Sequence, residues 1–210
     1  MSASARTNIL NKIKKALEQP TPLPFPEAVG VENPYQPAQQ ELALEFAEQF
    51  TNLQGKFILS ANRNELAEQF YTLCHQNQWT MVYCAEDDIK QQLQQWQWFE
   101  DISRCEVAVT SCETLVARTG SMVLSSMANG RVPSVYAPIH ICIAYTSQLV
   151  YDLSEAIQGL EKKYTTSFPS MFSLATGPSR TADIEKTLVV GVHGPKEVYC
   201  FLVEDLAPAS

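Results

Sequence analysis

The sequence predicts an α/β fold of three layers, α/β/α, in which helices cover both faces of a mostly parallel sheet. Two observations predict it. From about residue 38 onward, near-continuous apolar segments of strand length alternate with longer amphipathic segments. The chain also has 210 residues, of which 45% are hydrophobic, so it is long enough and apolar enough to bury a substantial core.

Residues 1–37 are predicted to form an arm that precedes an α/β domain of residues 38–210. The segment "TNILNKIKKAL" predicts a short amphipathic helix with lysines opposite its apolar face, which contains Ile9, Leu10, Ile13 and Leu17. The next segment, "QPTPLPFPEAVGVENPYQP", holds six of the twelve prolines. Proline fixes φ and lacks an N–H donor, so this segment is predicted to be extended.

The first half of the domain predicts two helices and two strands. An apolar stripe over residues 42–53 predicts a helix that ends at Gly55, and "KFILSA" predicts a strand. Asn62, three residues before Glu65, is a capping pattern that predicts the start of a second helix. "WTMVYCA" predicts the next strand.

The second half continues the alternation. "EDDIKQQLQQWQWF" predicts a helix with acidic residues at its positive end, and Ser147 is expected to cap a long helix that ends at Lys163. A helix is also expected in "TADIEKTLVV", with Ser179 or Thr181 as its cap. Five more segments predict strands: "CEVAVT", "SMVLSS", "HICIAYT", "SMFSLAT" and "EVYCFLVED".

Composition excludes several classes of protein. The net charge of −8 argues against nucleic-acid binding, and no apolar run approaches the ~20 residues of a membrane-spanning helix. The six cysteines form no C-x-x-C pair and lie among apolar residues, so we expect buried free thiols in a reducing cytoplasm. No metal site and no iron–sulfur cluster of its own is expected for this chain, because such sites favour clustered ligands.

Three of the six arginines, Arg118, Arg131 and Arg180, lie in glycine-bearing loops. Guanidinium groups suit carboxylate or phosphate, and glycine lets backbone amides approach a ligand, so these loops are a candidate anion site near the carboxyl ends of the strands. Local ion pairs for each arginine are the alternative. The remaining residues of the candidate site are Thr119, Gly120, Asn129, Gly177, Ser179 and Thr181.

The segment "TGPSRTADIEKTLVVGVHGP", residues 176–195, carries three of the eight glycines and the candidate catalytic residue His193. An imidazole between two glycines suits acid–base chemistry or a structural hydrogen bond. The segment lacks the spacing of a phosphate-binding P-loop, and Asp183 and Glu185 would repel a polyphosphate, so a small monoanion fits better. His75 and His140 are less informative. The chain has no Ser-His-Asp order, H-E-x-x-H or G-x-S-x-G.

That segment, together with "RTNILNKIKKAL", "VAVTSCETLVARTGSMVLSS" and the following "NGR", resembles the LUD-domain family. The resemblance implies a fold like that of the NagB/RpiA/CoA-transferase proteins. It also implies a cytoplasmic role in oxidising L-lactate to pyruvate, in a complex with iron–sulfur partner subunits. This chain would then bind a small organic acid or act as a scaffold, and could form a homo-oligomer. Arg118 stands where family members often have an acidic residue.

Two other functions remain open from the sequence. One is a stand-alone enzyme of the same fold, either a CoA transferase or an ATP-dependent folate cyclo-ligase. A CoA transferase needs a glutamate nucleophile in Glu-x-Gly or Glu-Asn-Gly, and neither tripeptide occurs here. The other is a non-catalytic sensor of an organic acid.

Overall fold

The computed structural model describes residues 3–18, 37–127, 130, 132–184 and 187–205. The chain divides into two units, Met1–Pro37 and Ala38–Ser210. In the first unit, helix α1 (Ala3–Leu17) confirms the predicted amphipathic helix, with its last turn basic and with Ile9, Leu10 and Ile13 each about half exposed. The predicted extended arm falls almost entirely on residues 19–36, which lie outside the described residues.

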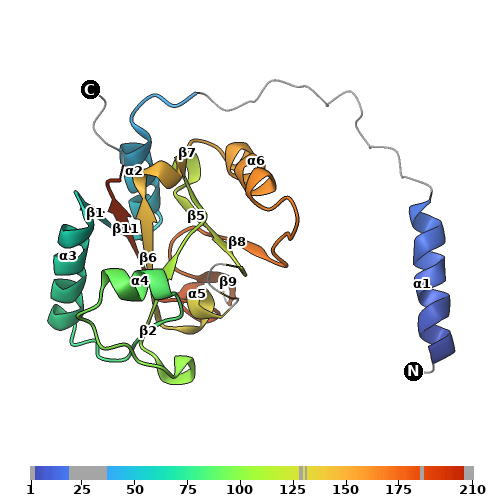
Figure 1. Cartoon of the computed structure of the whole chain (residues 1–210), viewed down its shortest axis with the longest axis horizontal. Helices are drawn as coiled ribbons and strands as arrows, with labels where there is room; N and C mark the ends of the chain where they lie inside the picture. The colour runs from blue at the N-terminus through green and yellow to red at the C-terminus, as the bar shows by residue number, and fades with distance from the viewer. Residues whose placement is uncertain (1–2, 19–36, 128–129, 131, 185–186, 206–210) are drawn as a thin grey trace. The chain divides into compact units, whose positions relative to one another are not determined.

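A five-stranded sheet forms the centre of the second unit (Figure 1). All four strand pairs are parallel, which confirms the mostly parallel sheet that the sequence predicts. The strand order is β1-β11-β6-β3-β2. The strands are β1 (Lys56–Ser60), β2 (Val82–Cys84), β3 (Val107–Ser111), β6 (Ile139–Tyr145) and β11 (Glu197–Val203). In β6 and β11 nearly every residue is buried, as expected of strands covered on both faces.

Helices cover one face of this sheet. Helix α3 (Arg63–Gln76) and the short α4 (Asp87–Gln92) pack there, and Phe70 of α3 contacts Phe201 of the sheet in a T-shaped arrangement. The side chain of Asn62 accepts hydrogen bonds from the N–H groups of residues 64 and 65, as the capping pattern predicts. The helix predicted over residues 86–99 is shorter than expected, since α4 ends at Gln92.

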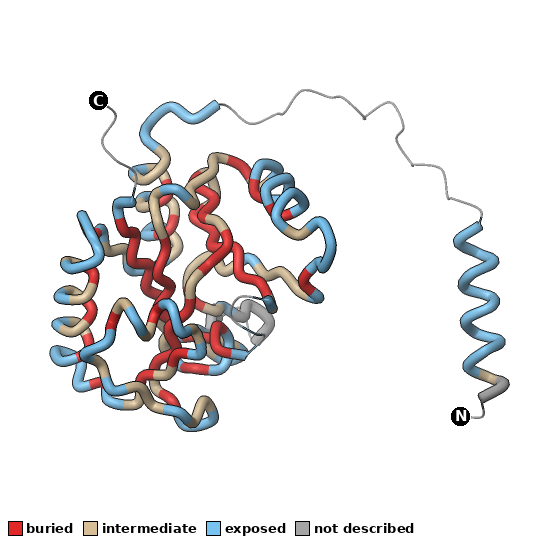
Figure 2. The backbone as a smooth tube through the Cα atoms, viewed as in Figure 1, coloured by how far each residue is buried: buried red, intermediate tan, exposed pale blue. Residues whose placement is uncertain are grey.

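The other face is covered by α2 (Leu42–Asn52) and by a second sheet. Phe46 and Phe50 of α2 pack in one buried cluster with Leu202 of the central sheet and Met122 of the second sheet, and Figure 2 shows the buried parts of the backbone in red. The second sheet has the order β7-β4-β5-β8, and α6 (Leu153–Lys163) packs against it. Its strands are β7 (Leu149–Val150), β4 (Thr114–Val116), β5 (Ser121–Ser125) and β8 (Phe172–Ala175). The layer on this face is therefore part helix and part sheet.

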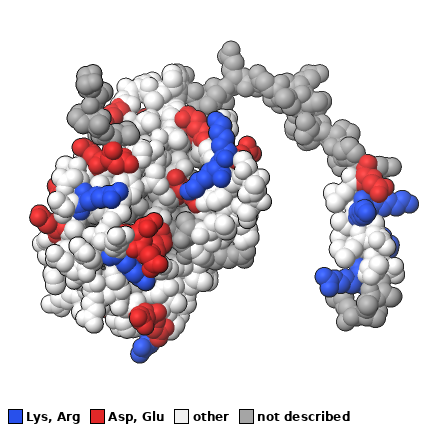
Figure 3. Space-filling model, viewed as in Figure 1, with Lys and Arg blue, Asp and Glu red and all other residues white. Residues whose placement is uncertain are grey.

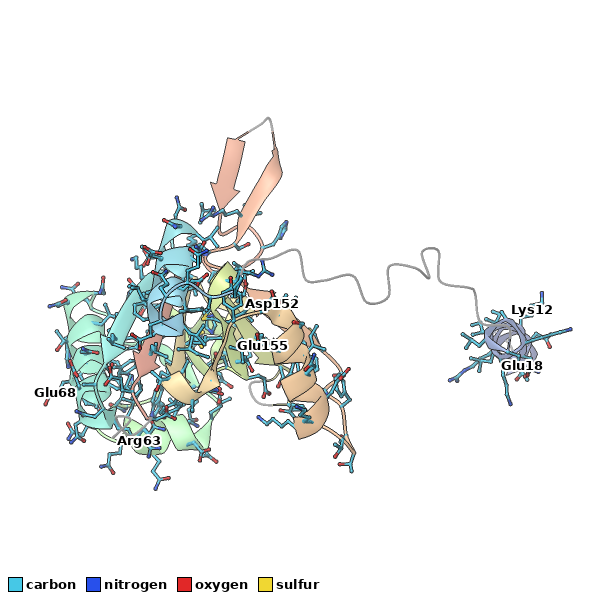
Figure 4. All side chains as sticks on the ribbon, turned by 90° about the horizontal axis from the view of Figure 1, so that it is seen from above. Lys12, Glu18, Arg63, Glu68, Asp152 and Glu155 are labelled. Atoms are coloured by element: carbon cyan, nitrogen blue, oxygen red, sulfur yellow. The ribbon has the colours of Figure 1, made fainter. Side chains whose placement is uncertain are left out.

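Two predicted helices are wrong in whole or in part. The segment after Gly177 forms an antiparallel pair, β9 (Arg180–Ile184) and β10 (Thr187–Val190), which projects from the body of the domain in Figure 4. Ser179 and Thr181 therefore cap no helix, and Asp183 lies in a strand. The β-branched residues of "TADI" and "TLVV" favour strands.

The helix expected from Ser147 begins instead at Leu153, after the N-cap Asp152. Leu149 and Val150 form β7, and Ser147 donates a hydrogen bond from Oγ to Asp205 at 2.6 Å. Four short elements complete the fold of the described residues. They are η2 (Ile102–Arg104), η3 (Ala117–Thr119), α5 (Pro133–Tyr136) and η4 (Thr146–Gln148).

Charged side chains are dispersed over the face seen in Figure 3, where acidic and basic groups lie near one another. Ion pairs in the described part of the chain include Lys56 with Glu197 at 2.7 Å and Arg104 with Asp101 at 2.8 Å. Among the described residues, none of the helices has the length and apolar character needed to cross a membrane.

Candidate ligand cavity

A cavity of about 280 Å³ lies where both ends of the segment 176–195 meet the two sheets. Gly177 and Ser179 line it from one end of that segment, and His193 lines it from the other. Apolar side chains from β5, β8 and β11 form much of its wall. We call this space the motif cavity.

Backbone hydrogen bonds hold the two ends of the segment together. The Ser179 N–H donates to the carbonyl of Pro195, and the Gly191 N–H donates to the carbonyl of Ser179, both at 2.9 Å. Gly177 has a φ of +82°, and a Cβ there would lie 2.5 Å from the carbonyl oxygen of Leu53. Because both the conformation and the space exclude a side chain, glycine is required at this turn.

His140 lines the motif cavity from the second position of β6 and is only 1% exposed. Its Nε2 lies 2.8 Å from the hydroxyl oxygen of Thr110, whereas its Nδ1 has no hydrogen-bond partner in the part of the chain that the structure describes. Burial lowers the pKa of His140 to about 4, so the imidazole is neutral at pH 7. Sequence reasoning set this residue aside, although a histidine in the otherwise apolar run "HICIAY" was a signal.

The described candidate arginines contact protein groups instead of lining the cavity. Arg118 Nε lies 2.6 Å from an oxygen of Asp152, the N-cap of α6 that Figure 4 labels. The Ser154 N–H and Arg118 hold the pKa of Asp152 below its usual value, despite the opposing effect of burial. The Arg180 guanidinium donates to the carbonyl of Leu53. Asn129, Arg131 and Glu185 lie outside the described residues.

Thr119 and Gly120 lie beside the carboxyl end of α2. Gly120 has a φ of +61°, and a Cβ there would come within 2.5 Å of the Phe50 nitrogen. A chain of hydroxyl groups runs from Thr119 to Ser121 at 2.8 Å and from Ser121 to Thr176 at 2.9 Å. Thr176 lines the motif cavity, so this chain links the middle loop to it. Of the described candidate residues, Gly177, Ser179 and His193 thus line the motif cavity, and Thr119 is linked to the cavity through the hydroxyl groups of Ser121 and Thr176.

The position of the motif cavity differs from the expected one. His140 and Val198 are each the second residue of their strand, so the cavity lies near the amino ends of β6 and β11. A larger open cleft of about 720 Å³ lies at the carboxyl ends, between α3 and α4, and is lined by Arg63, Ser111 and Tyr145 among others. None of the candidate residues that the structure describes lines that cleft.

The six cysteines are free and buried, as the sequence predicts. Cys112, Cys142 and Cys200 lie close together in the core under α2, where hydrogen bonding between the thiols and burial raise the pKa of Cys112 well above its usual value. Within the described ranges, no three His, Cys, Asp or Glu side chains are placed to hold a metal ion.

Comparison with known proteins identifies relatives of this chain. The family model of the LUD domain matches residues 87–203. Lactate utilization protein C of Bacillus licheniformis is 37% identical over 121 residues, covering 52% of this chain and 50% of that protein, and its namesake in Bacillus subtilis is 36% identical over the same shares. An uncharacterised protein of Neisseria meningitidis, NMB1437, is 33% identical over 113 residues, 52% of this chain and 48% of that protein. The chain therefore spans about half the length of the curated relatives it matches.

The crystal structure of a DUF162 family protein from Deinococcus radiodurans has the same fold. It superposes with a TM-score of 0.59 at 18% sequence identity and covers 80% of this chain and 99% of that one. At this identity the likeness concerns the fold alone.

Proposed function

Because this chain belongs to the LUD domain family, we propose that it takes part in lactate utilization. The observation that carries the proposal is the similarity of about half of the chain to several curated proteins named lactate utilization protein C. The segment that the family model matches, residues 87–203, includes every strand of the second sheet and every described residue that lines the motif cavity.

In its finer form, the proposal makes this chain a cytoplasmic subunit that works with iron–sulfur partner subunits in oxidising L-lactate to pyruvate. The chain's own thiols do not fit a cluster, since all six are buried in the core, and burial raises the pKa of Cys74 and Cys84 to about 12. Electrons from lactate would therefore pass to clusters held by the partners.

This chain would contribute the site for the small acid. The motif cavity has a volume suited to a ligand of a few carbon atoms, and it combines apolar walls with a few polar groups, as small-molecule sites do. Ser179 and the exposed His193 stand at its outer part. His193 is the candidate for proton transfer to or from the ligand hydroxyl.

Growth and co-purification test the proposal together. Deleting the chain from its host should slow or abolish growth on L-lactate and leave growth on glucose unchanged. An affinity pull-down of the tagged full-length chain from lactate-grown cells should recover partners that contain iron. Normal growth of the deletion strain on L-lactate would refute the role, and pulled-down material without iron would refute the iron–sulfur assembly.

A further inference from the structure

Helix α1 presents an apolar face that the proposed function does not use. Ile9, Leu10, Ile13 and Leu17 recur at intervals of three and four residues, so they lie along one face of the helix. The first three are about half exposed, and Leu17 is 76% exposed. A helix of about this length is only marginally stable by itself in water, and burial of an apolar face is what usually stabilises it. The exposed face therefore indicates a surface against which α1 packs.

Basic side chains border this apolar face. Helix α1 contains Arg6, Lys12, Lys14 and Lys15 and no acidic residue, in a chain whose net charge is −8. Lys12 and Lys14 are the sequence neighbours of Ile13, and successive residues point about 100° apart around a helix, so one lysine borders each side of the face. Figure 3 shows the basic side chains of α1 in blue, and Figure 4 looks along the helix axis, with Lys12 labelled. The helix is thus a cationic segment of an acidic chain.

An anionic lipid surface matches both properties of α1. Nucleic acid would neutralise the basic side chains and leave the apolar face in water. A protein groove fits less well, because protein interfaces are enriched in aromatic residues and depleted in lysine, whereas α1 has three lysines and no aromatic residue. In a bilayer surface, acyl chains cover the apolar face, while the lysine ammonium groups reach the headgroups on long apolar stems. Arg6, one turn before Leu10, is placed to pair with a lipid phosphate through its guanidinium group.

We propose that α1 binds in the plane of an anionic lipid bilayer, with its apolar face among the acyl chains and its basic side chains at the headgroups. The binding is reversible, because one short helix with four large apolar residues buries far less area than a membrane-spanning helix. Each basic side chain near the anionic surface strengthens binding about fivefold, which corresponds to about 1 kcal/mol. This inference is independent of the proposed role in lactate utilization.

Co-sedimentation of the full-length chain with lipid vesicles tests the inference. The chain should sediment with vesicles of phosphatidylcholine and phosphatidylglycerol mixed in equal parts, and it should stay in the supernatant with vesicles of phosphatidylcholine alone. Raising the salt concentration from about 0.1 M to about 1 M shortens the screening length from about 10 Å to about 3 Å, so it should release most of the bound chain. Lys14→Gln should weaken binding about fivefold at the lower salt concentration. Lys162→Gln, at an exposed position of α6, is the matched control and should bind like the unmutated chain.

Leu10→Gln tests the apolar face, and Leu44→Gln on α2 is its matched control, because both leucines are 54% exposed. Glutamine forms helices nearly as well as leucine, so Leu10→Gln should leave α1 helical and weaken binding about tenfold or more, whereas Leu44→Gln should leave binding unchanged. Sedimentation with neither kind of vesicle, equal sedimentation with both, or unchanged binding by Leu10→Gln would overturn the inference. If the chain ignores vesicles while Leu10→Gln loses a protein from the pull-down, the apolar face binds a protein and the inference also falls.

Discussion

Replacing Glu113 by glutamine should destabilise the domain markedly, because this carboxylate is buried and holds three side chains. Glu113 is 1% exposed at its side chain and accepts hydrogen bonds from Ser125, from Tyr164 at 2.6 Å and from Lys163 at 2.7 Å. Burial opposes its charge, yet hydrogen bonds from Lys163, Ser125 and Tyr164 outweigh that effect and lower its pKa. The network joins the residue just before β4, and the last residue of β5, to the end of α6.

The magnitude follows from the kinds of hydrogen bond lost. A hydrogen bond to a charged group contributes about 1.5–3 kcal/mol to stability, and one between neutral groups contributes about 0.5–1.5 kcal/mol. The hydrogen bonds from the Ser125 and Tyr164 hydroxyl groups should therefore each lose roughly 1 kcal/mol when their acceptor becomes neutral. The Lys163 side chain is 60% exposed, so its part is screened and at most about 1 kcal/mol. Glu113→Gln should therefore cost about 2–3 kcal/mol, which lowers Tm by roughly 4–12 °C in a domain of this size.

Thermal unfolding followed by circular dichroism at several pH values is the assay, with Lys163→Gln as the matched control. A carboxylate with a lowered pKa stabilises the folded state above its ordinary pKa of 4.5, and this contribution is lost as the pH falls through the lower folded value. The difference in stability between the unmutated chain and Glu113→Gln should be constant near pH 6–7 and shrink below pH 4.5. A difference that grows on acidification, or one no larger than that of Lys163→Gln, would refute the reasoning.

Three further changes have definite expected outcomes. Gly177→Ala should destabilise the domain by more than about 1 kcal/mol, because a positive φ disfavours alanine and the added Cβ would meet the Leu53 carbonyl. Chemical denaturation measures the loss of stability, and an unchanged unfolding midpoint would contradict the turn geometry. Asn62→Ala should cost about 1 kcal/mol in the same assay through loss of the α3 cap, whereas Asn62→Asp should cost little. Because all six thiols are buried, they should resist a thiol-specific reagent at pH 8 in the native protein and react once the protein is denatured. Rapid reaction of Cys142 in the native protein would instead show that the core under α2 opens readily.

The sequence predicted the central sheet well because buried parallel strands leave a strong pattern. "HICIAY" and "VYCFLV" are apolar on both faces, and only a sheet covered on both sides buries such runs. The second sheet gave a weaker pattern. Two of its strands, β4 and β7, have three and two residues, too few for any periodicity to emerge.

The sequence predicts only part of the candidate site. Local patterns identify turn residues, whereas contacts between residues far apart in the chain depend on the fold. Glycines and turns marked Gly177, Ser179 and His193, which do line one cavity. Asp152, which pairs with Arg118, is 34 residues away in the sequence, and no spacing rule predicts this contact. The sequence gives His140 too little weight for a similar reason, since only the fold shows that one of its nitrogens lacks a partner among the described residues.

The contacts of α2 have a consequence for how the domain can be divided. Every described residue that lines the motif cavity lies between positions 124 and 198, inside the segment 87–203 that the family model matches. The residues that support it come earlier in the chain. Phe50 and Leu53 at the end of α2 lie against Gly120 and Gly177, and β1 and β2 form both edges of the central sheet. A fragment trimmed to the family segment would keep the whole pocket lining and lose the helix against which its turns are set, so we expect it to aggregate instead of binding acid.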